Sequence, residues 1–330
     1  MMSQADTPAE LGYLFPDEWE EHAGTMMIFP AKHSYGRKTD GLRGEFTALA
    51  AAIAENEPVH VFCLAAERES CRRWLEGISN LTIHSGDYRI DWARDNAPML
   101  IRNREGRLAS AGFRFNGWGN KYQGWQRDAA TRDNISRVMN WPVFHSEFVL
   151  EGGAIEIGNA IGIVTESCVL NPNRTSWSRA QVERELKKML GLKRVVWVKS
   201  GLMPDKVTDG HVDGLLKFIS KDTVMLHTTD YRRDMNFSIC QEAKRVLLAA
   251  GLKVIELPLA DDIVHMNFYI GSGGGIAYVP ICGDPAQDDP ALNIIRGRYA
   301  KVIPILSVKL AEAGGGIHCY TQQIPRIGGK

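Results

Sequence analysis

The chain has 330 residues, of which 44% are hydrophobic and 24% are charged, so it is long and apolar enough to bury a sizeable core. Lysine plus arginine and aspartate plus glutamate both number 39, which gives a formal net charge of zero, and the sequence contains no long basic run. Nucleic acid and anionic membrane surfaces are therefore not expected as partners, and a small molecule is the better expectation.

Residues 1–20 lack the basic and apolar regions of a signal peptide, and no stretch approaches the ~18 apolar residues that a membrane span requires. The six cysteines are spread along the chain without C-x-x-C spacing, which favours reduced thiols over a disulfide framework or a zinc knuckle. These features predict a cytoplasmic protein with a single domain over residues 1–330, in which residues 1–14 form a short N-terminal extension.

Short apolar runs rich in β-formers alternate with helical patterns along the whole chain. The first expected elements are strands at 25–30, 59–63 and 81–84 and helices at 42–55 and 67–78. The order then returns four times, with the expected strands at 99–101, 109–115, 154–157, 161–165, 195–198, 215–219, 224–228, 254–257, 268–270, 276–279 and 302–305, and the expected helices at 125–139, 179–190, 236–250 and 291–299. This alternation predicts an α/β fold.

Conspicuous polar residues stand at the junctions between these groups of elements. The markers are Asp95, Glu151, His211, Asn267 and Cys319, and the intervals between them are 56, 60, 56 and 52 residues. A repeat of this length with two or three strands and one helix is typical of a radial, propeller-like array. Because such an array brings the start of each repeat toward one axis, these dispersed residues are expected to line one pocket.

The last junction has the pattern of a presented nucleophile. Gly314–Gly316 allow the backbone to turn tightly and to approach a ligand, and they lead to Cys319, which is flanked by His318 and by the polar residues 321–323. The alternative is a buried thiol that serves packing only, as is common for free cysteine. A nucleophile also requires a base and charge partners, which other junctions must supply.

The earlier junctions are acidic. Asp91, Trp92, Arg94 and Asp95 precede one strand, and the alternative to a functional cluster is a salt-bridged loop in which Arg94 pairs with Asp91 or Asp95. Glu151 precedes two glycines at the start of another strand. The alternative to a functional role is an ordinary surface glutamate before a turn.

The junction at 208–214 places a histidine between two aspartates. If this segment is extended, Asp209, His211 and Asp213 share one face, and the carboxylates hold the tautomer of the histidine and raise its pKa. The H-x-D pair could also bind a metal, but the other histidines (His227, His265 and His318) do not lie at a recognised metal spacing. No metal is therefore expected.

A thiol, a histidine and several carboxylates fit covalent catalysis on a cationic substrate. Asp95, Glu151 and Asp213 would suit a planar cation with several N–H donors, and a guanidinium matches carboxylates in a bidentate manner. The residues thus predict a guanidino substrate.

Eight stretches, in the family's order, resemble the agmatine deiminase and bacterial peptidylarginine deiminase family, which belongs to the guanidine-modifying pentein superfamily: FPDEWEEHAGT, DWARDNAP, NGWGNKY, LEGGAIEIG, LNPNR, TDGHVDG, MNFYIG and GGGIHCYTQQIP. The resemblance runs from about Phe15 to Pro325. It implies a five-bladed α/β propeller, a pentein, built from pseudo-repeated ββαβ units around a central active site.

The resemblance also implies a role for each matching residue. The nucleophile falls on Cys319, the general acid and base on His211, the guanidinium-binding aspartates on Asp95 and Asp213, and the remaining active-site glutamate on Glu151. Substrate contacts are further expected from Gly316 and from the faces of Trp92 and Trp118, although tryptophan in a propeller is more often a core residue. The implied mechanism proceeds through an amidino-thioether on the cysteine and requires no metal and no organic cofactor.

Two departures from the family pattern affect the expected substrate. The acidic residue that family members acting on agmatine usually carry four positions before the histidine is Val207 here, preceded by Lys206, and Asn96 and Ala97 replace the common threonine and glycine. The default expectation is deimination of agmatine to N-carbamoylputrescine. The alternatives are another guanidino compound (arginine, peptidyl-arginine or a specialised metabolite) or, less favoured, amidino transfer. A homo-oligomer is an open expectation.

Overall fold

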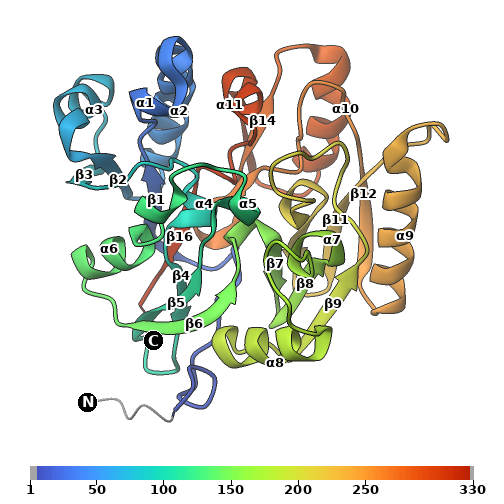
Figure 1. Ribbon diagram of the computed structural model, residues 1–330. Helices are drawn as coiled ribbons and strands as arrows, with labels where there is room; N and C mark the ends of the chain where they lie inside the picture. Colours follow the sequence, from blue (N-terminus) through green and yellow to red (C-terminus); the bar gives the residue numbers. More distant parts are fainter. Residues whose placement is uncertain (1–5, 328–330) are drawn as a thin grey trace. The chain divides into compact units, whose positions relative to one another are not determined.

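The strands of the computed structural model, which describes residues 6–327, form five small separate sheets (Figure 1). The chain divides into two compact units, one made of residues 6–17, 98–256 and 325–327 and the other of residues 18–97 and 257–324. The prediction of one domain over residues 1–330 stays a prediction.

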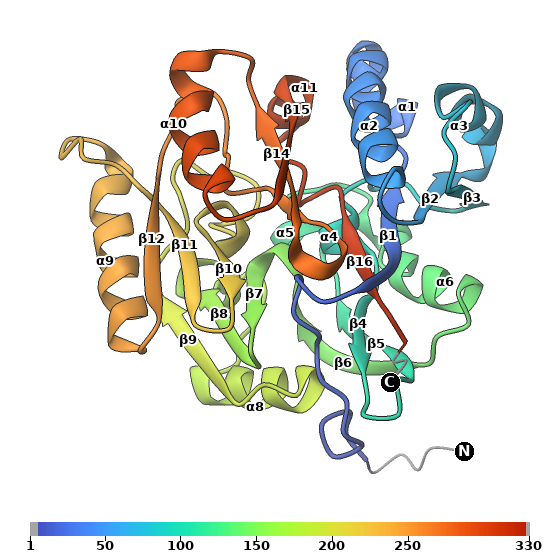
Figure 2. The same ribbon diagram turned by 180° about the vertical axis from the view of Figure 1, so that it is seen from behind.

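The first unit contains three sheets of three strands. Their strands are β4 (Met99–Arg102), β5 (Leu108–Arg114) and β6 (Val143–Val149); β7 (Ile155–Gly158), β8 (Ile161–Thr165) and β9 (Arg194–Val198); β10 (Leu216–Ser220), β11 (Thr223–Thr228) and β12 (Lys253–Pro258). The first two strands of each sheet pair antiparallel, and β6 and β9 pair parallel to their neighbours after a helical crossover. The crossover helices are α6 (Thr131–Val138), α8 (Arg179–Leu190) and α9 (Met235–Ala249). Figure 2 shows α9 alongside the sheet that contains β11.

The second unit contains the other two sheets. Its strands are β1 (His22–Ile28), β2 (Val59–Leu64), β3 (Leu81–Gly86) and β16 (Gln322–Pro325) in one sheet, and β13 (Tyr269–Ile270), β14 (Ile276–Ile281) and β15 (Lys301–Leu306) in the other. Its α-helices are α1 (Lys32–Tyr35), α2 (Thr39–Ala54), α3 (Arg68–Trp74), α4 (Ala93–Asn96), α10 (Pro285–Arg296) and α11 (Val308–Ala313). Because β16 pairs with β1, the C-terminal strand completes the first ββαβ unit of the chain. The expected pseudo-repeat is therefore confirmed.

Amphipathic helices build the core of each unit. Leu42, Phe46, Leu49 and Ile53 recur on one face of α2 and are buried with residues of β1 and β2. The apolar face of α8 is likewise buried against residues of the neighbouring sheets. Full burial of one such side chain contributes about 1.5–3 kcal/mol, so these helices are held by packing more than by propensity.

Some expected elements differ from the structure. The expected helix at 125–139 is a 3₁₀ turn, η3 (Trp125–Arg127), followed by the shorter α6, and the helix expected at 291–299 begins earlier and runs through Pro290. Asp284 caps that helix by accepting a hydrogen bond from the Ala286 N–H at 3.0 Å, and Pro285 occupies the first turn, where a missing N–H costs nothing.

The N-terminal segment that was expected to be an extension packs against the first unit. Tyr13 lies in the core of that unit, and the Ala9 N–H donates to the Lys188 carbonyl at 3.1 Å. Among residues 6–327 no helix combines the length and the apolar composition of a membrane span.

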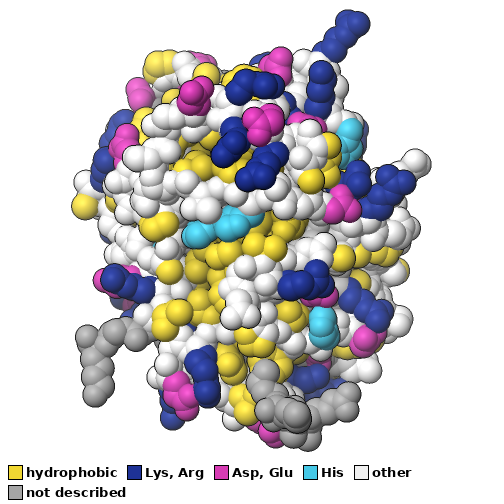
Figure 3. Space-filling model, turned by 90° about the vertical axis from the view of Figure 1, so that its left-hand side faces the viewer, with side chains coloured by type: hydrophobic (Ala, Val, Ile, Leu, Met, Phe, Trp, Pro, Cys, Tyr) yellow, Lys and Arg dark blue, Asp and Glu magenta, His cyan; other side chains and the backbone are white. Residues whose placement is uncertain are grey.

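Surface charge is mixed on the face of the molecule drawn in Figure 3. The described Lys and Arg side chains stand in small groups among acidic, histidine and apolar side chains. This distribution agrees with the zero net charge, while the absence of a nucleic-acid partner stays a prediction.

Candidate active site

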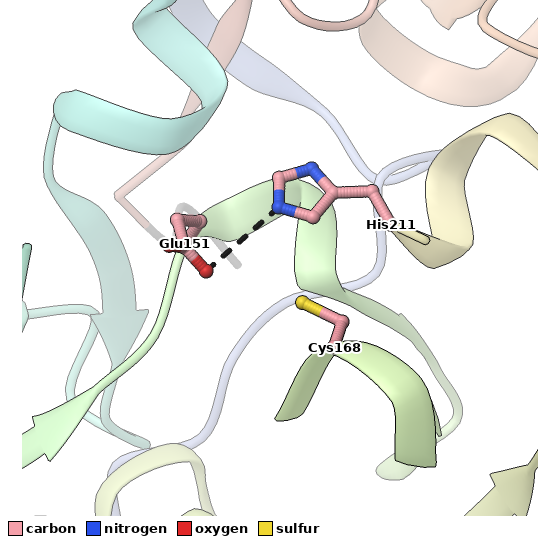
Figure 4. A group of neighbouring side chains, drawn as sticks. All are labelled: Glu151, Cys168 and His211. Carbon is pink, nitrogen blue, oxygen red and sulfur yellow. Dashed lines mark ion pairs between the residues drawn. The ribbon is translucent and has the colours of Figure 1, made fainter. Parts of the chain in front are cut away.

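His211 and Glu151 face each other in the first unit. Each lies directly before a single 3₁₀ turn, His211 before η5 (Val212–Gly214) and Glu151 before η4 (Gly152–Ala154). The Nε2 atom of His211 lies 3.8 Å from Oε2 of Glu151, and both side chains are buried. Figure 4 shows the imidazole ring directed toward the Glu151 carboxylate.

Arg174 supports this pair from the other side of the carboxylate. Its Nε donates to Oε1 of Glu151 at 3.0 Å, and each of the two side chains is 1% exposed. Burial by itself raises the pKa of Glu151, but His211 and the Arg174 guanidinium outweigh it and lower that pKa below its ordinary value. Glu151 is therefore an anion that can orient His211 and stabilise its protonated form.

The loop before His211 is not extended, which corrects the expectation for residues 209–213. Asp209 has a φ of +64° and Gly210 a φ of +94°, so the backbone turns sharply there. The Asp209 carboxylate bonds to Lys121, Arg174 and Asn173, and the Arg174 Nη1 lies 2.6 Å from it. Glu151, which is 60 positions earlier in the chain, is the carboxylate placed beside His211.

Asp213 and Trp118 are buried in the same unit. Asp213 lies in η5, directly after the histidine turn, and is 2% exposed. Trp118 has a φ of +54°, a left-handed conformation that costs a non-glycine residue about 1–2 kcal/mol. Its indole packs edge-on against Phe115, with the ring centroids 5.2 Å apart. This packing agrees with the core alternative, and substrate contact by Trp118 stays a prediction.

The nucleophile loop belongs to the second unit. Cys319 is partly exposed; its N–H donates to Oδ1 of Asn267 at 3.2 Å, and its carbonyl accepts from the Arg94 N–H at 3.0 Å. A Cβ at Gly316 would lie 2.6 Å from Oδ1 of Asn267, so only glycine allows this approach. The glycines thus bring the loop against Asn267, and the loop presents Cys319.

Asp95 and Trp92 lie beside this loop. Asp95 is in the short helix α4 and is 4% exposed, and the Trp92 ring packs on Tyr320 with centroids 4.5 Å apart. A Cβ at Gly315 would lie 2.3 Å from Cζ3 of Trp92, so the second glycine of the run is also fixed by packing.

Arg94 pairs with Glu18, with Nη2 3.6 Å from Oε2. The alternative of a loop in which Arg94 pairs with Asp91 or Asp95 stays a prediction. Asp91 accepts hydrogen bonds from the hydroxyl groups of Tyr35 at 2.8 Å and Tyr320 at 2.7 Å.

Each unit thus brings together its own share of the predicted site residues. His211, Glu151, Asp213 and Trp118 belong to the first unit, and Cys319, Asp95, Trp92 and Gly316 belong to the second. Sequence reasoning missed Arg174, although it lies in the quoted LNPNR stretch, and it assigned no role to Asn267 beyond its place in the repeat. The Cys168 thiol is also buried and lies beside His211 (Figure 4).

Glu151, Cys168 and His211 also form a group that could hold a metal ion. Their ligand atoms lie within 4.8 Å of one another, and a carboxylate, a thiol and an imidazole would suit Zn²⁺. However, the Arg174 guanidinium already neutralises Glu151 and would repel a second cation. Burial also raises the pKa of Cys168, which opposes the thiolate that a metal needs. An acid and base pair is the better interpretation, and the expected absence of a metal stays a prediction.

Comparisons with known proteins place the chain in a family. A family model described as Porphyromonas-type peptidyl-arginine deiminase matches residues 14–325. An agmatine deiminase of Stutzerimonas stutzeri is 32% identical over 98% of this chain and 99% of its own length. The solved agmatine deiminase of Enterococcus faecalis has a TM-score of 0.91 at 26% identity and covers 98% of this chain and 99% of its own. DDAH from Pseudomonas aeruginosa has a TM-score of 0.56 at 14% identity over 92% of this chain and 100% of its own, which shows a shared fold alone.

These likenesses confirm the predicted fold class, the α/β pentein of ββαβ units. They also confirm, at the level of the family, the expectation of a deiminase-type hydrolase that acts on a guanidino C–N bond. The chain belongs to the Porphyromonas-type peptidyl-arginine deiminase family.

Proposed function

We propose that the protein hydrolyses agmatine to N-carbamoylputrescine and ammonia. The observation that carries this proposal is the end-to-end match with an agmatine deiminase, which spans 98% of this chain and 99% of that relative. The residues that deimination requires, a thiol, an imidazole and several carboxylates, all stand in matching motifs of this chain.

His211 would act as the general acid and base. Glu151, 3.8 Å from its Nε2, favours the imidazolium form, and Arg174 keeps Glu151 ionised in its buried place. A histidine held in this way can donate a proton to a departing amine and then accept one from water. This pair therefore supports hydrolysis at neutral pH.

The reaction would take two steps. In the first, the Cys319 thiolate attacks the guanidinium carbon and a C–S bond forms; His211 donates its proton, the bond to the terminal nitrogen breaks, and ammonia leaves. In the second, His211 takes a proton from water, whose oxygen attacks the same carbon; the C–S bond breaks, the thiolate is restored, and the ureido product departs. No oxidant or cofactor is required.

Asp95 and Asp213 would hold the guanidinium. Both are almost fully buried, and a buried carboxylate binds a planar, multiply donating cation far better than a neutral ligand. Trp92 and Trp118 would offer aromatic faces to the same cation.

The second candidate is deimination of a different guanidino compound, such as arginine or peptidyl-arginine. The observation that favours it is Val207, a 43% exposed apolar residue where agmatine enzymes usually carry an acid, next to the exposed Lys206. A lysine there could meet the carboxylate of a substrate. Amidino transfer shares the first step and differs only in the group that resolves the thioether.

The test is an assay of the purified protein with agmatine, arginine, a blocked arginine peptide and other guanidines, in which ammonia and ureido product are both measured. Agmatine turnover that is lost in Cys319→Ala but kept in Cys282→Ala, a cysteine that is also partly exposed, would support the proposal. Turnover of arginine or the peptide, with agmatine inert, would favour the second candidate. No ammonia from any guanidine would contradict hydrolysis and direct attention to amine acceptors.

Cytoplasmic location and homo-oligomeric assembly remain predictions from the sequence. Agmatine is small and polar, so its hydrolysis does not require a membrane or a nucleic acid as a partner.

A further inference from the structure

Glu18 lies at the centre of a buried polar network in the second unit. Its Oε2 lies 2.8 Å from Nε2 of His318, and its Oε1 accepts a hydrogen bond from the Ile270 N–H at 2.9 Å. Glu18 is 6% exposed and His318 is 1% exposed. A carboxylate in such a place is costly unless it is paired, so these contacts fix its position.

Arg94 joins the same network from α4. Its Nη2 lies 3.6 Å from Oε2 of Glu18, and its Nη1 donates to Oε1 of Gln323 at 2.9 Å. Arg94 is 4% exposed, and Glu18 is a carboxylate within ion-pair distance of its guanidinium. Loss of the Glu18 charge would therefore leave a buried cation with less compensation.

The network holds the two elements that carry the proposed chemistry. His318 directly precedes Cys319, and Arg94 directly precedes Asp95. The Arg94 N–H also donates to the Cys319 carbonyl at 3.0 Å, so the α4 helix and the nucleophile loop are bonded at the backbone as well. Glu18 binds the side chains on both sides of this junction, and a 1 Å displacement of a reacting group can cost about 10²-fold in rate.

We propose that Glu18 is a positioning residue: its carboxylate locks His318 and Arg94 and thereby fixes the Cys319 thiol relative to the Asp95 carboxylate. This inference rests on the proposed function, in which Cys319 attacks a guanidinium held by Asp95. In this proposal Glu18 acts through these two partners.

The chain offers a matched control for a test. His265 and Asp288, in the same unit, form a similar buried pair with Nε2 2.9 Å from Oδ1, and they are 0% and 4% exposed. Asp288 bonds to His265 and to the backbone near Cys282, not to α4 or the nucleophile loop. Glu18→Gln and Asp288→Asn thus each remove one buried charge from a histidine pair, and only the first does so beside Cys319.

The experiment measures kcat with agmatine and, without substrate, the pH midpoint of Cys319 alkylation by iodoacetamide, followed on the Cys319 peptide by mass spectrometry. For Glu18→Gln we expect kcat to fall at least tenfold more than for Asp288→Asn. We also expect the alkylation midpoint to move to lower pH, because the Arg94 cation loses a counter-charge and then favours the Cys319 thiolate. A merely structural residue would lower the thermal midpoint without moving the alkylation midpoint.

Each outcome decides the inference. A kcat loss more than threefold beyond that of the control, together with a shift in the alkylation midpoint, supports positioning. A kcat within threefold of the control, or a larger loss with an unmoved alkylation midpoint, overturns it. If Glu18→Gln does not fold, His318→Gln is compared with Asp288→Asn instead. This variant keeps an N–H donor for Glu18, and the same limits on kcat and on the alkylation midpoint apply to it. If the wild type turns over no guanidine, the proposed function fails on its own account, and the alkylation midpoint alone then decides whether Glu18 governs Cys319.

Discussion

Arg174 and Glu151 form an ion pair that is hidden from solvent: Nε lies 3.0 Å from Oε1, and each side chain is 1% exposed. Removal of the cation would leave a buried, uncompensated carboxylate beside His211. Arg179 and Glu166 form a pair of similar length, 3.1 Å, in which the side chains are 50% and 39% exposed. The two pairs differ in burial far more than in geometry.

We therefore expect Arg174→Gln to lower the free energy of unfolding by about 3–5 kcal/mol, and Arg179→Gln to lower it by no more than about 1 kcal/mol. Urea unfolding of both variants measures the difference. We also expect Arg174→Gln to reduce kcat, since Glu151 would then tend to protonate and release His211. Equal costs for the two variants would contradict the interpretation that burial gives the first pair its importance.

The packing of Gly315 on Trp92 leads to a second prediction. A methyl group at Gly315 would lie 2.3 Å from the indole, whereas one at Gly44, on the exposed face of α2, would meet no atom within 4 Å. We expect Gly315→Ala to displace Trp92 and the adjoining α4, and so to lower kcat/KM by at least tenfold. Gly44→Ala should instead raise the free energy of unfolding by about 0.5–1 kcal/mol, because alanine favours a helix over glycine. Unchanged activity in Gly315→Ala would show that the indole can move freely.

The exposed position of Val207 leads to a third prediction. Because its side chain is 43% exposed, Val207→Asp should change the free energy of unfolding by less than about 0.5 kcal/mol. If agmatine is the substrate, a carboxylate here should attract its distal amine and increase the ratio of kcat/KM for agmatine to that for arginine. Val207→Asn, which has the same size and no charge, should leave this ratio close to that of the wild type. A ratio that is unmoved by the aspartate would place the amine elsewhere.

Local signals explain which elements could be predicted from the sequence. Helix α8 was predicted with its observed bounds because Ser178 and Gln181 form a capping box at its start and Gly191, with a φ of +67°, ends it. By contrast, β16 has the polar sequence Gln-Gln-Ile-Pro and was not predicted, because it becomes a strand only by pairing with β1, some 300 positions earlier. Strands set by distant partners leave little trace in their own sequence.

The candidate site follows the same division. Cys319, His211, Glu151, Asp95 and Asp213 could be named from their motifs, and their catalytic roles stay predictions. The neighbour of His211 could not be predicted, because alternation assumes an extended chain and Asp209 has a positive φ. Arg174 and Glu18 were missed for another reason: each is a charged residue whose meaning depends on a buried partner far along the chain.

Asp91 leads to the last prediction, which concerns pH. Its carboxyl group is 1% exposed and accepts hydrogen bonds from Tyr35 and Tyr320; burial outweighs these bonds and raises its pKa from the ordinary 3.8 to about 6. Well below pH 3.8 the group is neutral in both the folded and the unfolded chain, so its burial does not lower the free energy of unfolding. As the pH rises toward 6 the group ionises first in the unfolded chain, and above pH 6 the free energy of unfolding is lower by roughly 3 kcal/mol.

Asp91→Asn should remove this loss, because the amide stays neutral and its oxygen can still accept from a tyrosine hydroxyl. The thermal midpoint of Asp91→Asn should therefore rise relative to that of the wild type as the pH increases from 4.5 to 7.5. Thermal unfolding at a series of pH values measures this difference. Asp289→Asn, at an exposed position of α10, serves as the control, because a substitution at the surface changes the free energy of unfolding little. A difference for Asp91→Asn that does not vary with pH would mean that the Asp91 carboxyl group already ionises as easily in the folded chain as in the unfolded one.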